Sequence, residues 1–98
     1  MDVNMTQEGT RLIVTVTGRL NTGTAPDFEN KLIPAIDGIT ELIIDFAGLD
    51  YISSAGLRIV LTAQKKMNRQ GTMVIRNVKP EIYEVFEMTG FVDFLTIE

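Results

Sequence analysis

The apolar positions along the chain recur with two periods, one of two residues and one of three to four residues. In the segment 11–17 the side chains at 12, 14 and 16 are apolar, while threonines occupy 15 and 17. This alternation predicts a strand with one face better buried than the other. A short turn at 8–10 separates this segment from residues 2–7, so the two segments predict an antiparallel hairpin near one edge of a sheet.

Three further segments predict strands. The run 41–46 is nearly continuous in apolar character, which is typical of a strand that is covered on both faces or lies centrally in a sheet. Residues 72–76 form the next apolar run, and a short apolar run follows at 94–97. We expect the run at 94–97 to form a last strand.

Apolar residues recur at helical spacing between these strands. Thr22 or Thr24 can cap the first helix, and Pro34 should bend or shorten it because proline removes one backbone donor. The second helix is expected to begin at Ser53 or Ser54 and to stop at Gly71. The third opens at Pro80 and ends before Gly90. The expected core positions of the three helices are Phe28, Leu32, Ile33 and Ile36, then Leu57, Val60, Leu61, Gln64 and Met67, then Ile82, Val85, Phe86 and Met88.

The order of the elements predicts the fold class. Strand, strand, helix, strand, helix, strand, helix and strand follow one another, and strands that alternate with helices imply right-handed crossovers onto a largely parallel sheet. We therefore expect an α/β fold with a mixed, largely parallel sheet of four to five strands, an N-terminal antiparallel hairpin and about three main helices. The chain of 98 residues is expected to form one domain over 1–98.

This topology also predicts a working surface. The loops that leave the carboxyl ends of parallel strands gather at one edge of such a sheet. Residues 21–24, 50–54 and 77–79 should therefore lie near one another, and we call these three segments the rim.

Composition narrows the chemistry that the rim can perform. The chain has no cysteine and no histidine, which removes thiolate nucleophiles, cysteine-ligated metals and the commonest general base. A serine hydrolase would need another base, but no Ser-x-x-Lys spacing occurs at Ser53 or Ser54, and no Gly-x-x-x-x-Gly-Lys loop is present for a nucleotide. We expect no enzyme activity, no metal and no cofactor.

Charge and hydropathy indicate a protein partner. The net charge of −4 and the isoelectric point of about 4.7 argue against direct nucleic acid binding through a broad basic face. The apolar runs are far shorter than a bilayer requires, and the first residues do not resemble a signal peptide. We expect a soluble, cytoplasmic protein that does not act at a membrane.

The rim contains Ser53 and Ser54, which are the only serines in the chain. Either hydroxyl can cap the second helix, and a phosphate carried there would lie at the positive end of that helix. Tyr51 is either an interface anchor or partly buried. Gly56 reflects either close approach by a partner or packing of the helix start against the sheet.

The segment 49–57, Leu-Asp-Tyr-Ile-Ser-Ser-Ala-Gly-Leu, resembles the anti-sigma factor antagonists of the STAS domain family. The block Val16 to Asn21 resembles the first strand-to-helix stretch of these proteins, Gly71 to Asn77 resembles their later strand, and Val85 to Gly90 resembles the end of their final helix. The resemblance extends over almost the whole chain and implies a STAS-like fold.

The resemblance also implies a function. In that family an anti-sigma factor with serine kinase activity phosphorylates the serine two positions before the glycine, which here is Ser54, with Ser53 as the second candidate. The unmodified form binds the anti-sigma factor and frees the sigma factor, phosphorylation ends the binding, and a PP2C-type phosphatase restores it. The expected partner-binding residues are Asn21, Thr22, Asp50, Tyr51, Ser53, Ser54, Ala55, Gly56, Leu57 and Arg58.

Two positions depart from the family's usual residues. Ser53 stands where an aspartate commonly precedes the acceptor serine, and Asn21 stands where the first strand-to-helix loop often has an acid. Both departures remove negative charge from the rim. The alternative function is therefore a STAS scaffold subunit of a signalling or lipid-transport assembly in which no phosphorylation occurs.

Overall fold

A four-stranded sheet forms the centre of the computed structural model, which describes residues 1–98. Its strands are β1 (Asp2–Glu8), β2 (Arg11–Leu20), β3 (Glu41–Ile52) and β4 (Thr72–Arg76), and they lie side by side in that order. β1 is antiparallel to β2, whereas β2, β3 and β4 are parallel to one another. The structure thus confirms the mixed, largely parallel sheet and the N-terminal hairpin.

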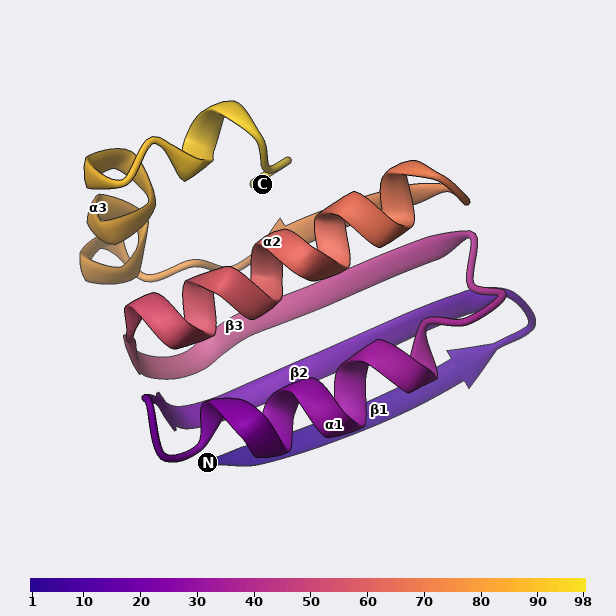
Figure 1. Ribbon diagram of the computed structural model, residues 1–98, viewed down its shortest axis with the longest axis horizontal. Helices are drawn as coiled ribbons and strands as arrows, with labels where there is room; N and C mark the ends of the chain where they lie inside the picture. Colours follow the sequence, from indigo (N-terminus) through magenta and orange to yellow (C-terminus); the bar gives the residue numbers. More distant parts are fainter.

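Neighbouring parallel strands must be joined by a crossover connection, and in this chain helices form these connections. They are α1 (Ala25–Ala35), α2 (Ser54–Asn68) and α3 (Pro80–Met88), followed by a short 3₁₀ helix η1 (Phe91–Asp93). α1 and α2 run alongside each other across one face of the sheet (Figure 1). The side chains of Leu12, Val14 and Val16 are buried on β2 and belong to a cluster of 24 buried apolar residues. No helix is long and apolar enough to cross a membrane.

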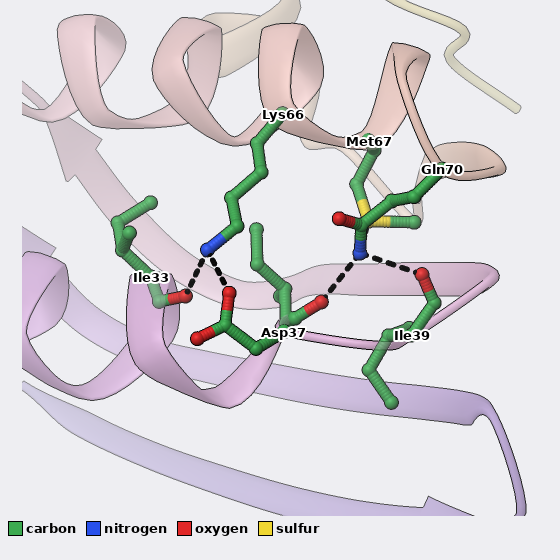
Figure 2. Close-up of polar contacts among 7 residues, drawn as sticks. Ile33, Asp37, Ile39, Lys66, Met67 and Gln70 are labelled. Atoms are coloured by element: carbon green, nitrogen blue, oxygen red, sulfur yellow. Dashed lines mark hydrogen bonds and ion pairs between the residues drawn. The ribbon is translucent and has the colours of Figure 1, made fainter.

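Polar side chains at the carboxyl end of α2 and just beyond it hold the carboxyl ends of α1 and α2 together (Figure 2). Lys66 forms an ion pair with Asp37, and its ammonium group donates to the carbonyl oxygen of Ile33 at 3.3 Å. The side-chain amide of Gln70 donates to the carbonyl oxygens of Ile36 and Ile39 at 2.5 and 2.7 Å. The carbonyl of Ile33 lies in the last turn of α1, where carbonyls lack intrahelical partners, and the carbonyls of Ile36 and Ile39 lie just beyond the helix.

Pro34 shortens α1, as its sequence position predicts. The proline lies in the last turn, and the helix ends one residue later at Ala35. The position is tolerated because the helix ends one residue later, so the missing N–H costs only the one bond to the carbonyl oxygen of Asn30.

β3 extends further than the apolar run 41–46 indicates. It continues to Ile52 because it accommodates two irregularities in its pairing with β2, one opposite Thr15 to Thr17 and one opposite Gly18 to Arg19. At each irregularity β3 has one extra residue, which is the property of a β-bulge. Gly48 permits the close approach of the strands, since a Cβ there would lie 2.6 Å from Cγ2 of Thr17. Asp50 and Tyr51 are therefore strand residues and not loop residues.

The expected last strand at 94–97 is wrong in its extent. Only Ile97 pairs with the sheet, through an isolated parallel bridge to Ile75. Gly90 adopts a φ of 77°, which glycine reaches without strain, and the chain then turns into η1. The sheet thus has four strands, within the predicted range of four to five.

The expected core position of Met88 on α3 is also wrong. Ile82 and Phe86 are buried on this helix, whereas 87% of Met88 is exposed. At 3.6 residues per turn, Met88 lies about 200° around the helix from Phe86 and so faces away from the core.

Candidate functional site

The three segments of the rim come together at the carboxyl ends of the parallel strands. The backbone N–H of Ser53 donates to the carbonyl oxygen of Leu20 at 2.8 Å, which joins the end of β2 to the start of α2. The ammonium group of Lys79 lies 2.6 Å from a carboxylate oxygen of Asp50, which joins the segment after β4 to the end of β3. The predicted clustering is therefore confirmed.

The two serines have different structural roles. Ser53 is the N-cap of α2 in an extended conformation, and its hydroxyl accepts a hydrogen bond from the N–H of Gly56 at 3.3 Å. Ser54 is the first residue of the helix, it is exposed, and its hydroxyl makes no hydrogen bond within the chain. Because Ser53 performs the capping, the hydroxyl of Ser54 is free.

Gly56 and Leu57 lie in the core under this helix start. A Cβ on Gly56 would be 2.7 Å from Cγ of Leu20 and 3.0 Å from Cγ1 of Ile52. Leu57 is 4% exposed. The glycine therefore serves the packing of α2 against the sheet, and the surface beside the serines comes from Ala55 and Arg58 instead.

The loop before α1 is held by its own side chains. The amide oxygen of Asn21 accepts from the N–H groups of Gly23 and Thr24 at 2.9 and 3.0 Å. The hydroxyl of Thr24 donates to the carbonyl oxygen of Arg19 at 2.9 Å and makes no capping bond to α1, although Thr24 is the N-cap residue. Thr24 therefore holds the expected N-cap position, but no threonine side chain makes a capping bond, and Thr22 is exposed.

Basic side chains contact both Asp50 and the aromatic ring of Tyr51 at the rim. The hydrogen bond from Lys79, together with the positive charge of Lys79, lowers the pKa of Asp50, and Arg19 contributes a smaller effect in the same direction. The guanidinium carbon of Arg19 lies 4.4 Å from the ring centroid of Tyr51. Tyr51 remains 40% exposed.

A groove between α1 and α2 adjoins Ser54, and the sequence did not reveal it. It has a volume of about 250 Å³. It is lined by Thr22, Ala25, Pro26 and Glu29 from one side and by Ala55, Arg58 and Ile59 from the other. Glu29 and Arg58 take part in no ion pair of the protein. Only the parallel arrangement of the two helices brings these residues together, so no local sequence pattern marks them.

The side chains at this site are better suited to binding another protein than to catalysing a reaction. No three His, Cys, Asp or Glu side chains are grouped in a way that could hold a metal ion. Exposed hydroxyl, aromatic and charged groups beside a shallow groove can instead contact another protein.

The chain matches the STAS domain family over residues 2–98 and therefore belongs to that family. It is 36% identical to BtrV of Bordetella bronchiseptica, a protein named as an anti-sigma factor antagonist, with coverage of 99% of this chain and 85% of BtrV. It is 24% identical to the anti-sigma-B factor antagonist of Bacillus subtilis, with coverage of 99% of this chain and 90% of that protein.

The fold matches that of the Bacillus anti-sigma factor antagonist SpoIIAA. Its unphosphorylated form gives a TM-score of 0.84 at 19% identity, with coverage of 99% of this chain and 88% of SpoIIAA. Its phosphorylated form gives a TM-score of 0.77 at 19% identity, with coverage of 99% and 91%. These likenesses confirm the STAS-like fold. The matched antagonists are regulatory binding proteins and not enzymes, as the sequence predicts for this chain.

Proposed function

We propose that this protein is an anti-sigma factor antagonist whose rim binds an anti-sigma factor and whose binding ends when Ser54 is phosphorylated. The observation that carries the proposal is the division of roles between the serines. Ser53 caps α2, so the exposed hydroxyl of Ser54 can accept a phosphate without loss of a bond that holds the fold. The names of BtrV and the Bacillus subtilis relative support the class of function.

The proposed interface consists of the exposed part of the rim and the groove beside it. Thr22, Asp50, Tyr51, Ser54 and Arg58 are exposed there. Four other residues would contribute indirectly, because they hold the loop and the start of α2 that carry the exposed residues. These four are Asn21, Ser53, Gly56 and Leu57. Ala55 is half-buried at the edge of the groove.

Phosphorylation would act on the interface and leave the fold intact. A phosphoserine carries about −1.5 to −2 charges, and at a helix start this charge is favourable by about 0.3 to 1 kcal/mol. Burial of the same charge against a partner that has no matching cation costs more than that gain. A loss of about 1.4 kcal/mol already weakens binding tenfold. SpoIIAA has been solved in both unphosphorylated and phosphorylated forms, and both have the fold of this chain.

The proposed partners are an anti-sigma factor with serine kinase activity and a PP2C-type phosphatase that removes the phosphate, and the proposed place of action is the cytoplasm. The test is incubation with such a kinase from the native cell and ATP, followed by intact-mass measurement. We expect one phosphate on the wild type and on Ser53→Ala, and none on Ser54→Ala. Phosphate on neither serine in the wild type would favour the scaffold function instead.

Binding is tested separately by calorimetry with the same anti-sigma factor. We expect Ser54→Asp to bind at least tenfold more weakly than the wild type. Thr6→Asp adds the same charge on the exposed side of β1, far from the rim, and should bind like the wild type. Equal affinity of Ser54→Asp and the wild type would contradict the proposed switch.

A further inference from the structure

The acidic charge of the protein is concentrated in its last 19 residues. Residues 80–98 contain five of the 13 acidic residues and none of the nine lysines and arginines. The remaining residues, 1–79, carry nine basic and eight acidic groups, so their net charge is +1. None of the five acids, which are Glu81, Glu84, Glu87, Asp93 and Glu98, takes part in an ion pair.

Exposed apolar side chains occur in the same segment. Four large apolar side chains of the protein are exposed, and one of them, Tyr51, lies under Arg19 at the rim. The other three are Tyr83 at 38%, Met88 at 87% and Phe94 at 67% exposure. These three side chains lie within twelve residues of one another, in the same segment as the five unpaired acids.

The geometry of α3 places four of these groups together. Tyr83 and Glu87, and likewise Glu84 and Met88, are four residues apart, so they are neighbours on the outer side of the helix. Glu84, Glu87 and Met88 line a shallow hollow of about 340 Å³. Phe94 directly follows η1, which packs against α3. We call Tyr83, Glu84, Glu87, Met88 and Phe94 the C-terminal patch.

We propose that the C-terminal patch is a second docking surface, which binds a basic amphipathic helix of a protein partner. The apolar side of such a helix would cover Met88 and Phe94, and the flexible methionine side chain adapts to different partner shapes. Lysines and arginines beside that apolar side would face Glu84 and Glu87, which have no cation of their own chain. Nucleic acid and anionic membrane surfaces are repelled by the same carboxylates.

The patch is separate from the rim. The patch follows the rim segment 77–79 in the chain, and the N–H of Tyr83 donates to the carbonyl oxygen of Lys79 at 2.9 Å. Its side chains lie on the outer side of α3 and beyond, whereas Ser53 and Ser54 lie at the start of α2. The basic helix would thus contact neither serine, and its binding does not depend on the charge at Ser54.

The test uses a synthetic amphipathic helix of leucine and lysine, about 18 residues long so that it is helical in water. The matched probe has glutamate in place of every lysine. Each is titrated into the ¹⁵N-labelled full chain and followed by amide chemical shifts. We expect the lysine peptide to shift residues 80–95 and the glutamate peptide to shift none of them. We also expect Ser54→Asp to bind the lysine peptide like the wild type.

Two double variants distinguish an effect of the C-terminal patch on peptide binding from an effect of the protein's net charge. Glu84→Lys with Glu87→Lys should weaken binding of the lysine peptide at least tenfold. Asp2→Lys with Glu8→Lys makes the same change of charge at exposed positions of β1 and should weaken it less than twofold. Equal weakening by both pairs, equal shifts with the glutamate peptide, or shifts centred on the rim would overturn the proposal. The amide spectra themselves report whether each variant is folded.

Discussion

The ammonium group of Lys79 lies 2.6 Å from a carboxylate oxygen of Asp50, although 29 residues separate them in the chain. The contact joins the segment after β4 to the end of β3. The pKa of Asp50 is lowered from its ordinary value of 3.8, because Lys79 donates a hydrogen bond to the ionised carboxylate and carries the opposite charge.

Lys79→Ala should therefore raise the pKa of Asp50 toward its ordinary value, because both effects of Lys79 are lost and only the smaller effect of Arg19 still lowers it. Because the pKa is lowered in the folded state, the contribution of this pair to stability is present above 3.8 and is lost as the pH falls through the lowered value. The measurement is a pH titration of the Asp50 carboxyl carbon by NMR. Lys31→Ala, which removes a partner of Asp27 only, should leave the titration of Asp50 unchanged. An unaltered curve in Lys79→Ala would show that the pair is absent in solution.

Ser53→Ala should lower the free energy of unfolding by about 1 kcal/mol, because the N–H of Gly56 loses its acceptor. Ser53→Asp keeps an acceptor at the cap and should cost less. Ser54→Ala removes a hydroxyl without a partner and should change stability by less than about 0.5 kcal/mol. Urea unfolding of the three variants measures these differences. If Ser54→Ala lowered the free energy of unfolding more than Ser53→Ala, Ser54 and not Ser53 would be the residue that caps α2.

Gly56→Ala should lower the free energy of unfolding by about 1–2 kcal/mol. Alanine favours a helix by about 1 kcal/mol relative to glycine, but the added methyl group would overlap Leu20 at 2.7 Å. Leu20→Ala alone should cost about 2–5 kcal/mol because Leu20 is fully buried. The two changes together should cost less than the sum of the single changes, since the smaller residue makes room for the methyl group. Simple additivity in thermal or urea unfolding would argue against this contact.

Gln70→Ala should lower the free energy of unfolding by about 1–2 kcal/mol, because the carbonyl of Ile39 loses its donor and that of Ile36 keeps only the N–H of Ile39. Gln70→Glu should cost more, since it places a carboxylate against two carbonyl oxygens. Neither variant should alter binding at the rim beyond its effect on stability, because Gln70 lies just beyond the carboxyl end of α2, remote from the serines. Urea unfolding combined with calorimetry of partner binding checks both statements.

Most of the fold could be predicted because its main features depend on local sequence patterns or on the order of strands and helices. The apolar run 41–46 and the alternation at 11–17 marked strands, and the alternation of strands and helices placed the rim. The extent of β3 could not be predicted, since Gly48 and Asp50 are typical of turns and only the pairing with β2 reveals the bulges. The groove beside Ser54 depends on how α1 lies against α2, and no spacing in the sequence encodes that contact.

The candidate site was predicted in part. The segment from Leu49 to Leu57 indicated the two serines, but only the backbone geometry showed that Ser53 is the cap and that Ser54 is free. The exposure of Met88 and Phe94 was not predicted, because their apolar character alone suggested core positions. The turn at Gly90 directs this last segment away from the expected strand.

Helices α1 and α2 are joined by polar contacts only at the ends remote from the serines, through Lys66 and Gln70 (Figure 2). No hydrogen bond or ion pair links Pro26 or Glu29 to Ala55 or Arg58, so the amino ends rest on packing alone. The start of α2 stays fixed to the sheet by the bond from the N–H of Ser53 to Leu20 and by the packing of Gly56 on Leu20. Widening of the groove beside Ser54 would therefore cost packing contacts but no hydrogen bond or ion pair between α1 and α2.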